Sequence, residues 1–297
     1  MNYVSTIGFF DGVHRGHQYL LRQLLDEGKR RGLATRVYTF AEHPRRVLQA
    51  DYQPQLLTTL EEKRVFIAAE GIDECRVLEF DNQMARMTAA QFMQQILIPE
   101  GVKVLLMGYD HRFGSDRADF QVCRGLGEAL GVEILQEPPF SEDASQAISS
   151  SLVRRELRSG DVAAAACALG RYYSLSGTVG LGRRVGRDLG FPTANLQPDN
   201  AQKMLPAAGA YAVWAHVDGK RYAGMTNIGT RPTLQNGEDV TVETHILDFQ
   251  GDIYGHVLRL EFVERLRGEC QFAALDALRA QLHDDALRAK EILNKQK

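Results

Sequence analysis

The stretch GFFDGVHRGH, residues 8–17, decides how the first half of this 297-residue chain folds. It continues a short apolar run, YVSTIGFF at residues 3–10, which predicts a buried strand. It precedes QYLLRQLLDEGKRRG at residues 18–32, where the leucines are spaced for one face of a helix and Gly32 marks its end. The stretch is therefore expected to turn from the carboxyl end of a strand into the beginning of a helix.

The alternation of strand and helix continues to about residue 171. Two capping boxes, Thr59 with Glu62 and Thr88 with Gln91, mark the beginnings of helices. Further strands are predicted at residues 33–40, 76–80, 102–108 and 132–137, and further helices at residues 119–130, 148–160 and 161–170. Strands that alternate with helices imply an α/β domain with a parallel sheet and right-handed crossovers.

The second half has a different period. From about Tyr173 the sequence is rich in short alternating runs and turns, and Asp218-Gly219 between two such runs predicts a hairpin. Residues 271–293 return to helical spacing. We expect an antiparallel β-barrel with a terminal helix, and a sandwich is the alternative. We place the boundary at Arg171, which gives domains 1–171 and 172–297.

Composition excludes several classes of protein. The chain has 44% hydrophobic and 25% charged residues and a net charge of −3, so it has no general attraction for nucleic acid or anionic membranes. No membrane span or signal peptide is evident. The cysteines show no C-x-x-C spacing, which argues against a zinc or redox motif: Cys75, Cys123, Cys167 and Cys270. We expect a cytoplasmic protein with reduced thiols, and a homo-oligomer is left open.

The opening stretch has the features of a phosphate site. Ligands of open parallel sheets bind at the carboxyl ends of the strands, and a helix N-terminus offers free N–H groups and a partial positive charge. Gly12 and Gly16 let the backbone approach a ligand, and His14 and His17 can donate to phosphate oxygens and stabilise charge during attack. An ordinary glycine-rich turn with solvated histidines is the alternative, but the combination favours a nucleotide site.

The motifs of this chain, and their order, resemble those of a known family. GFFDGVHRGH is similar to the H-x-G-H motif of nucleotidyltransferases, which is related to the HIGH signature of class I aminoacyl-tRNA synthetases. Together with the following stretches it resembles the bacterial bifunctional riboflavin kinase/FMN adenylyltransferases: FAEHP (40–44), GYDHRFG (108–114), ISSSLVR (148–154), GRDLGFPTANL (186–196), TNIGTRPT (226–233) and VETHILDF (242–249). His111 stands where phenylalanine is commoner, and Ser151 replaces a threonine but keeps the hydroxyl.

For the first half, the resemblance implies a Rossmann-like nucleotidyltransferase domain. In its reaction the FMN phosphate attacks the α-phosphorus of ATP, with Mg²⁺ present, and pyrophosphate leaves. The residues expected to bind ATP are Gly8, Phe10, Asp11, Gly12, His14, Gly16, His17, Ser149, Ser150, Ser151 and Arg154, of which His14 and His17 are the catalytic candidates. The residues expected near flavin or nucleotide are His43, Pro44, Asp110 and Arg112.

For the second half, the resemblance implies a riboflavin kinase. Riboflavin offers a neutral hydroxyl that must lose a proton as it attacks the γ-phosphorus of ATP, and a carboxylate is the natural base. Glu243 occupies the family's general-base position, and strand alternation places it opposite the face of Val242 and Thr244. The resemblance assigns Thr193 and Asn195 to Mg²⁺ and the ATP phosphates. Gly180, Gly182 and Gly186 belong to a glycine-rich segment at 180–190, predicted to be a flap over ATP rather than a plain hairpin.

Two other functions compete with this one. A different H-x-G-H transferase, acting on pantetheine phosphate or tRNA, leaves the β-rich half unexplained. A non-catalytic flavin-binding regulator is expected to have lost some of the reactive residues, and all of them are present: His14, His17, Thr193, Asn195 and Glu243. The expected partners are therefore riboflavin, FMN and ATP, without nucleic acid or membrane.

Overall fold

The structure is a computed structural model, and it describes residues 1–49, 51–53, 55–109, 111–138, 140, 148–181, 190–232 and 238–296. Asp110, Gly182, Gly186 and most of the predicted flap lie outside the described residues. The chain divides into two compact units, Met1–Ser150 and Ser151–Lys297. Each unit is described by itself.

The first unit is built on the parallel sheet that the sequence predicts. The strands run in the order β3-β2-β1-β4-β5, and every pair is parallel. Their bounds are β1 Tyr3–Ile7, β2 Ala34–Phe40, β3 Glu74–Leu78, β4 Val102–Met107 and β5 Glu133–Gln136. The chain moves outward from β1 to β3 and then returns to the other side of β1 as β4. In open parallel sheets, ligands bind where the strand order reverses in this way, which here is the carboxyl end of β1.

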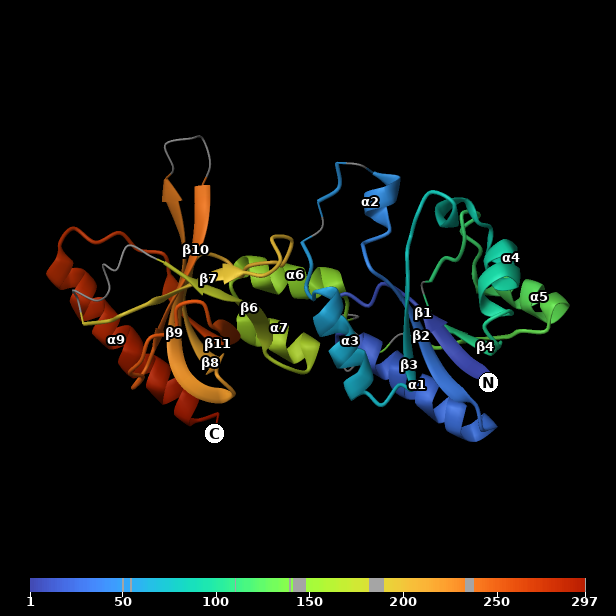
Figure 1. Cartoon of the computed structure of the whole chain (residues 1–297), viewed down its shortest axis with the longest axis horizontal. Helices are drawn as coiled ribbons and strands as arrows, with labels where there is room; N and C mark the ends of the chain where they lie inside the picture. Colours follow the sequence, from blue (N-terminus) through green and yellow to red (C-terminus); the bar gives the residue numbers. More distant parts are fainter. Residues whose placement is uncertain are drawn as a thin grey trace. The chain divides into compact units, whose positions relative to one another are not determined.

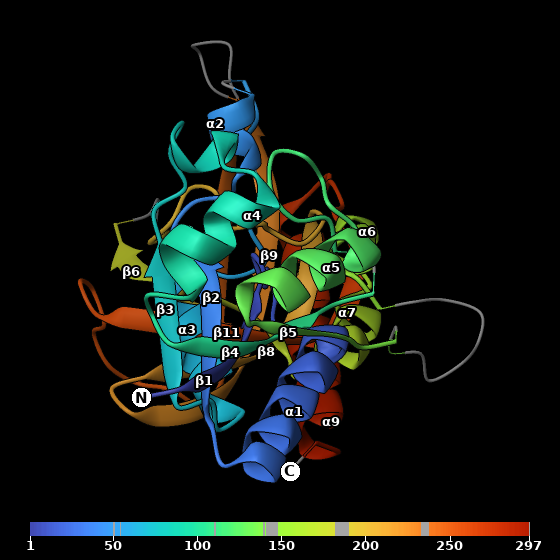
Figure 2. The same cartoon turned by 90° about the vertical axis from the view of Figure 1, so that its right-hand side faces the viewer.

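Helices cover both faces of this sheet (Figures 1 and 2). On one face α1 (Arg15–Arg31) and α3 (Leu60–Ala69) pack against the sheet through an apolar cluster that includes Leu21, Leu24 and Ile67. On the other face lie α4 (Ala89–Phe92), its π-helical continuation Met93–Leu97, and α5 (Phe120–Leu130). Both predicted capping boxes are present, at Thr59 and Thr88. Two short helices, α2 (Arg45–Leu48) and η1 (Met84–Arg86), also lie in the described part of this unit.

The second unit is a closed antiparallel barrel, which confirms the barrel and excludes the sandwich. Its strands follow the order β10-β7-β6-β11-β8-β9 around the barrel. Their bounds are β6 Tyr173–Gly180, β7 Ala194–Pro198, β8 Gly209–Val217, β9 Lys220–Pro232, β10 Glu238–Ile246 and β11 Val257–Gly268. The predicted hairpin turn joins β8 to β9 at Asp218 (φ 51°) and Gly219 (φ 73°), both in the left-handed region that a type I′ turn requires.

Three helices of the described residues accompany the barrel. α6 (Ser150–Ser159) and α7 (Val162–Leu169) come before it in the chain, and α7 packs against β11 and β6. The last helix, α9 (Leu275–Asn294), lies along the outside of the barrel over β8 and β9 (Figure 1). Ala289 and Leu293 of α9 join Trp214 in one apolar cluster. The barrel and its terminal helix thus share a core of their own.

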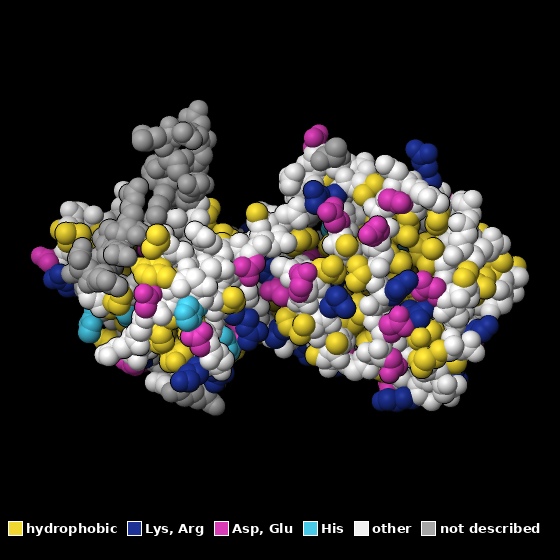
Figure 3. All heavy atoms as spheres, viewed as in Figure 1, with side chains coloured by type: hydrophobic (Ala, Val, Ile, Leu, Met, Phe, Trp, Pro, Cys, Tyr) yellow, Lys and Arg dark blue, Asp and Glu magenta, His cyan; other side chains and the backbone are white. Residues whose placement is uncertain are grey.

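The surface carries charges of both signs. On the face drawn in Figure 3, acidic and basic side chains are interspersed rather than gathered into one large field. Across the described ranges, no helix is long and apolar enough to cross a membrane. The four cysteines are free thiols.

Candidate active sites

The H-x-G-H turn forms the N-terminus of α1. The helix begins at Arg15, three residues earlier than the periodicity predicts, because His14 is its N-cap. The Nδ1 atom of His14 accepts a hydrogen bond from the backbone N–H of His17 at 3.4 Å. The two imidazole rings are stacked with 3.6 Å between their centroids. Both predicted histidines therefore sit together at a helix N-terminus at the carboxyl edge of the sheet.

The backbone before the helix is folded tightly. Phe10 (φ 53°) and Val13 (φ 39°) adopt the left-handed region together with Gly12 (φ 84°). Such a conformation is costly for bulky and β-branched residues, and it persists only where the surroundings enforce it. Strain of this kind is common at ligand sites.

The serine-rich motif, at the end of the first unit in sequence, packs against this turn. A Cβ atom on Gly16 would lie 3.1 Å from the carbonyl oxygen of Ile148, so a glycine is needed for the two segments to approach. The hydroxyl of Ser150 donates to the carbonyl oxygen of Asp11 at 2.8 Å. Two motifs more than 130 residues apart in sequence are thus brought together at one edge of the sheet. Ser151 and Arg154 lie on α6, which belongs mainly to the second unit.

Asp11 is turned into the protein. Its side chain is only 4% exposed, and its carboxylate accepts hydrogen bonds from the backbone N–H groups of Leu57 (2.9 Å) and Thr58 (3.1 Å). The N–H of Gly12 donates in turn to the hydroxyl of Thr58 at 3.0 Å. These bonds fasten the turn to the segment that leads into α3.

The FAEHP motif lies beside the same turn. The ring of His43 is 4.5 Å from the ring of Phe9, centroid to centroid, and its Nδ1 accepts from the N–H of Arg45 at 3.1 Å. Pro44 is the residue directly before α2. Arg112, by contrast, is half-exposed and pairs with Asp119 at 3.5 Å.

A buried lysine near this edge is not evident from the sequence. Lys63, in the first turn of α3, is only 2% exposed. Its Nζ donates to the carbonyl oxygens of Phe9 and Phe40, each at 3.0 Å, and lies 4.0 Å from the centre of the Phe9 ring. Burial lowers the pKa of this ammonium to about 8, against the opposing effect of the nearby Asp11 carboxylate. A lysine that directly follows a capping box is expected to face the solvent. The sequence therefore contains no indication that Lys63 is buried.

In the second unit, Glu243 occupies the middle of a polar row across three strands. It is paired in register with Asn195 of β7 on one side and with Asn227 of β9 on the other. Val242, Thr244 and Ile246 are buried, while Glu243 and His245 are half-buried on the opposite face, as the alternation predicts. The strand thus directs Glu243 away from the barrel core.

Glu243 lines a pocket of about 270 Å³ between the barrel and α9. The walls include Thr193, Asn227 and His245 from the barrel side, and Phe272 and Leu282 from the C-terminal segment. His245 is fixed by a 2.8 Å contact between its Nδ1 and the carbonyl oxygen of Pro192. Asp285, Glu269 and Arg267 also line the pocket, so it combines apolar walls with several charged groups. Such a setting suits a flat organic molecule that carries a hydroxyl.

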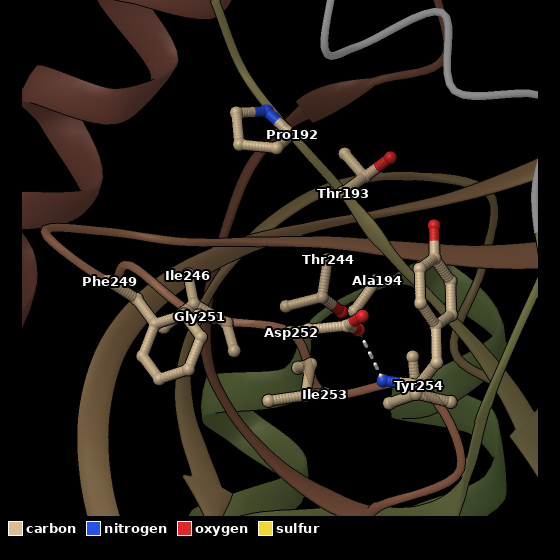
Figure 4. Close-up of a pocket in the computed structure, with 11 residues that line it drawn as sticks. Pro192, Thr193, Ala194, Thr244, Ile246, Phe249, Gly251, Asp252, Ile253 and Tyr254 are labelled. Atoms are coloured by element: carbon tan, nitrogen blue, oxygen red, sulfur yellow. Dashed lines mark hydrogen bonds between the residues drawn. The ribbon is translucent and has the colours of Figure 1, made fainter.

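A second pocket of about 280 Å³ adjoins it (Figure 4). Its walls are Pro192, Thr193 and Thr244 on one side and the segment Phe249–Tyr254 on the other. The carboxylate of Asp252 accepts from the N–H of Tyr254 at 3.0 Å, which closes this segment into a tight turn (Figure 4). Thr193 lines both pockets, so a group held at Thr193 can face either one.

Several pocket residues were not predicted from sequence. The segment Phe249–Tyr254 follows a strand, and its sequence predicts only a polar turn. Its combination of glycine, aromatic and acidic residues is the one feature of the sequence that could have indicated a ligand pocket. Leu278 and Leu282 of the predicted helical stripe line the Glu243 pocket, while Leu275 is 64% exposed. The apolar stripe of α9 thus serves partly as the wall of a site.

Comparisons with known proteins match each half of the chain to a family. The FAD synthetase family matches residues 1–152, and the Riboflavin kinase family matches residues 169–293. The bifunctional riboflavin kinase/FMN adenylyltransferase of Escherichia coli strain K12 is 38% identical over 291 residues, 97% of this chain and 92% of that protein. The protein of the same name from Pseudomonas fluorescens is 35% identical over 293 residues, with the same coverage of each chain.

One solved structure is similar over nearly the whole chain. It is a crystal structure described as a macrolide-efflux protein from Streptococcus pneumoniae, with 30% sequence identity and a TM-score of 0.90. The match covers 97% of this chain and 94% of that one. The similarity thus extends to the complete arrangement of elements within each unit.

Proposed function

This chain belongs to the family of bifunctional riboflavin kinases/FMN adenylyltransferases, and we propose which of its residues perform each of the two reactions. The enzyme phosphorylates riboflavin to FMN with ATP. It then transfers an adenylyl group from ATP to FMN, giving FAD and pyrophosphate. We assign adenylyl transfer to the domain of residues 1–171 and phosphorylation to that of residues 172–297, with both reactions in the cytoplasm.

Adenylyl transfer is assigned to the turn that holds His14 and His17. The phosphate of FMN is already ionised, so the reaction needs positioning and charge stabilisation more than a base. The N-terminus of α1 supplies N–H groups and a partial positive charge, and the two imidazoles lie beside it. We assign Ser149 and Ser150 to the same task, which the bond from Ser150 to the turn supports. Contact of Ser151 and Arg154 with ATP stays a prediction.

Contact of Asp11 with ATP stays a prediction, and we propose an indirect role for this residue. Its carboxylate is buried and accepts from the backbone at Leu57 and Thr58. An anion facing ATP would also repel its phosphates. We therefore assign Asp11 to shaping the turn, while Gly12 and Gly16 allow the close approach of backbone and ligand.

Phosphorylation is assigned to the two pockets that share Thr193. Glu243 lines one pocket and accepts the proton of the riboflavin hydroxyl, so that pocket holds the flavin. The other pocket, bounded by Pro192 and Phe249–Tyr254, then holds ATP. The γ-phosphate lies at their common border by Thr193, where the hydroxyl can reach it. This shared border is the observation that carries the assignment.

Thr193 at that border, together with Asn195, which is paired in register with Glu243, suits Mg²⁺. The hydroxyl of Thr193 and the amide oxygen of Asn195 are hard, neutral donors of the kind this ion accepts alongside phosphate oxygens and water. Within the described ranges, no group of three or more His, Cys, Asp or Glu side chains could hold a metal ion by itself. Held by Thr193 and Asn195 together with ATP, such an ion would supply charge neutralisation at the phosphates.

Two variants, each assayed for both reactions, test this division of labour. In Glu243→Gln, the loss of the base should lower riboflavin phosphorylation about 10²–10⁴-fold and leave FMN-to-FAD conversion within about twofold. In His14→Ala/His17→Ala, FAD formation from supplied FMN should fall about 10²–10³-fold while phosphorylation is kept. Glu261→Gln, a strand carboxylate that contacts His216 outside both pockets, is the control. Equal loss of both reactions in either variant contradicts the assignment.

A further inference from the structure

Lys63 is in an unfavourable place for a lysine. A cation in the first turn of a helix opposes the helix dipole, and removing an ammonium from water is costly. The position is 2% exposed, so an apolar side chain such as methionine would fill it without either penalty. A buried charge retained under these conditions needs a specific task to explain it.

The contacts of Lys63 indicate that task. Its two carbonyl partners are Phe40, the last residue of β2, and Phe9, two residues beyond the end of β1. The His14–His17 turn begins directly after Phe9, and the FAEHP motif begins with Phe40 itself. One ammonium thus joins the starting points of the two loops that carry the predicted ligand residues of the first unit.

Other groups around the ammonium reinforce this arrangement. The hydroxyl of Thr39 also donates to the Phe9 carbonyl, at 3.2 Å. The Phe9 ring contacts the ammonium and also contacts His43. The titratable groups around Lys63 are Asp11, which lies between Phe10 and Gly12, two residues with positive φ, and Cys75 of β3, whose own pKa is raised by burial. His43 contacts the same Phe9 ring that Lys63 touches. Asp11 supplies the compensating negative charge.

We propose that Lys63 is a positioning residue for adenylyl transfer, which holds the His14–His17 turn and the His43 segment at a fixed separation through the carbonyls of Phe9 and Phe40. Lys63 itself does not touch the reacting groups. The inference rests on the assignment of adenylyl transfer to the His14–His17 turn. It predicts that this reaction depends on an ammonium at position 63.

The test compares Lys63→Met, Lys63→Arg and the wild type in the full-length enzyme. Arg64→Met, an exposed cation one residue along α3, is the matched control. A shift of about 1 Å in a positioned group can cost about 10²-fold, so Lys63→Met should lower kcat for FMN-to-FAD conversion by roughly that factor. KM for FMN and the rate of riboflavin phosphorylation on the same protein should change less than about threefold.

A pH profile separates positioning from simple packing. Because burial lowers the pKa of Lys63 to about 8, the wild-type ammonium becomes neutral as pH rises from 7 to 9.5, and adenylyl transfer should fall over this range. Lys63→Arg stays charged, so its activity, lower at pH 7, should remain flat to pH 9.5. Arg64→Met should follow the wild-type profile.

Three results overturn the proposal. The first is a kcat of Lys63→Met for FMN-to-FAD conversion that is close to that of the wild type. The second is a loss of activity in Lys63→Met that equals the fraction of unfolded protein measured by circular dichroism. The third is an alkaline fall in Lys63→Arg identical to that of the wild type. If His14→Ala/His17→Ala keeps full FAD synthesis, the site assignment itself is wrong, whatever the Lys63 variants show.

Discussion

Two buried hydroxyls behind Glu243 show how single residues set up the kinase site. Thr226 of β9 and Thr244 of β10 are opposite each other in register, almost without exposure, with 2.6 Å between their oxygens. The hydroxyl of Thr226 also donates to the backbone carbonyl of Glu243 at 3.2 Å. In a consistent arrangement, Thr244 donates to Thr226 and Thr226 donates to Glu243. Thr226 lines the Glu243 pocket and Thr244 the neighbouring one, so the pair supports the wall between them.

This chain of donors predicts an asymmetry between two isosteric variants. Thr226→Val leaves the Thr244 hydroxyl buried without its acceptor and should lower the free energy of unfolding by about 1–3 kcal/mol. Thr244→Val leaves Thr226 with the Glu243 carbonyl as acceptor and should cost about 1 kcal/mol or less. The double variant should cost no more than Thr226→Val alone, because it leaves no unpaired hydroxyl. Urea unfolding of all three, with Thr178→Val of β6 as control, measures the cycle. If the two single variants cost the same free energy of unfolding, and the double variant costs their sum, this order of donors is wrong.

At the scale of elements, the sequence predicted most strands and helices and the barrel, but not which distant strands pair in it. The parallel sheet follows from alternating strand and helix patterns, and both capping boxes form as predicted because their bonds are local. The pairing of β10 with β7 and of β11 with β6, which closes the barrel, joins distant segments that carry no mutual signal in one sequence. Lys63 and Phe249–Tyr254 were missed for the same reason, since their roles arise from packing rather than from local pattern.

An ion pair fastens α9 to the barrel beside the flavin pocket. The guanidinium of Arg267, near the end of β11, makes two bonds of 2.9 Å to the carboxylate of Asp285, which is 5% exposed and also accepts from Gln281. Both charged residues line the Glu243 pocket. The position of α9, and with it the apolar wall of the pocket, therefore depends on this contact.

Removal of this contact should loosen α9 without unfolding the barrel. Asp285→Ala removes the carboxylate partner of the Arg267 guanidinium, which keeps its bond to the Gly268 carbonyl, and should lower the free energy of unfolding by about 1.5–3 kcal/mol. KM for riboflavin should rise, while FMN-to-FAD conversion should be kept. Trp214, the single tryptophan, packs in the cluster with Ala289 and Leu293, so its fluorescence reports whether α9 is docked. An unchanged KM with undocked α9 would show that the helix does not form the flavin wall.

At the scale of the whole molecule, the structure divides into two units after Ser150, whereas the pattern of the sequence changes about 20 residues later. The period changes near Arg171, and the two family matches leave residues 153–168 between them. In the structure these residues belong with the barrel: the N–H of Ala207 donates to Leu157 at 2.9 Å, and Arg265 donates to the carbonyl of Ser159 at 3.0 Å. Helices that continue the α/β pattern in sequence thus supply packing for the β-rich unit.

This packing makes the choice of fragment decisive for separating the two activities. A fragment of residues 151–297 keeps α7, whose buried face, including Val162 and Leu169, contacts the barrel. A fragment of residues 172–297 lacks α7 and exposes that surface of the barrel. It should be less stable by about 3–5 kcal/mol, because the burial of two large side chains and several small ones of α7 is lost.

Below its unfolding temperature each fragment should phosphorylate riboflavin, and neither should make FAD, because His14 and His17 are absent. Thermal unfolding and product chromatography on both fragments measure this. A folded 151–297 fragment without kinase activity means that the kinase site is completed by residues of the first unit, and equal stability of the two means that α7 is dispensable to the barrel.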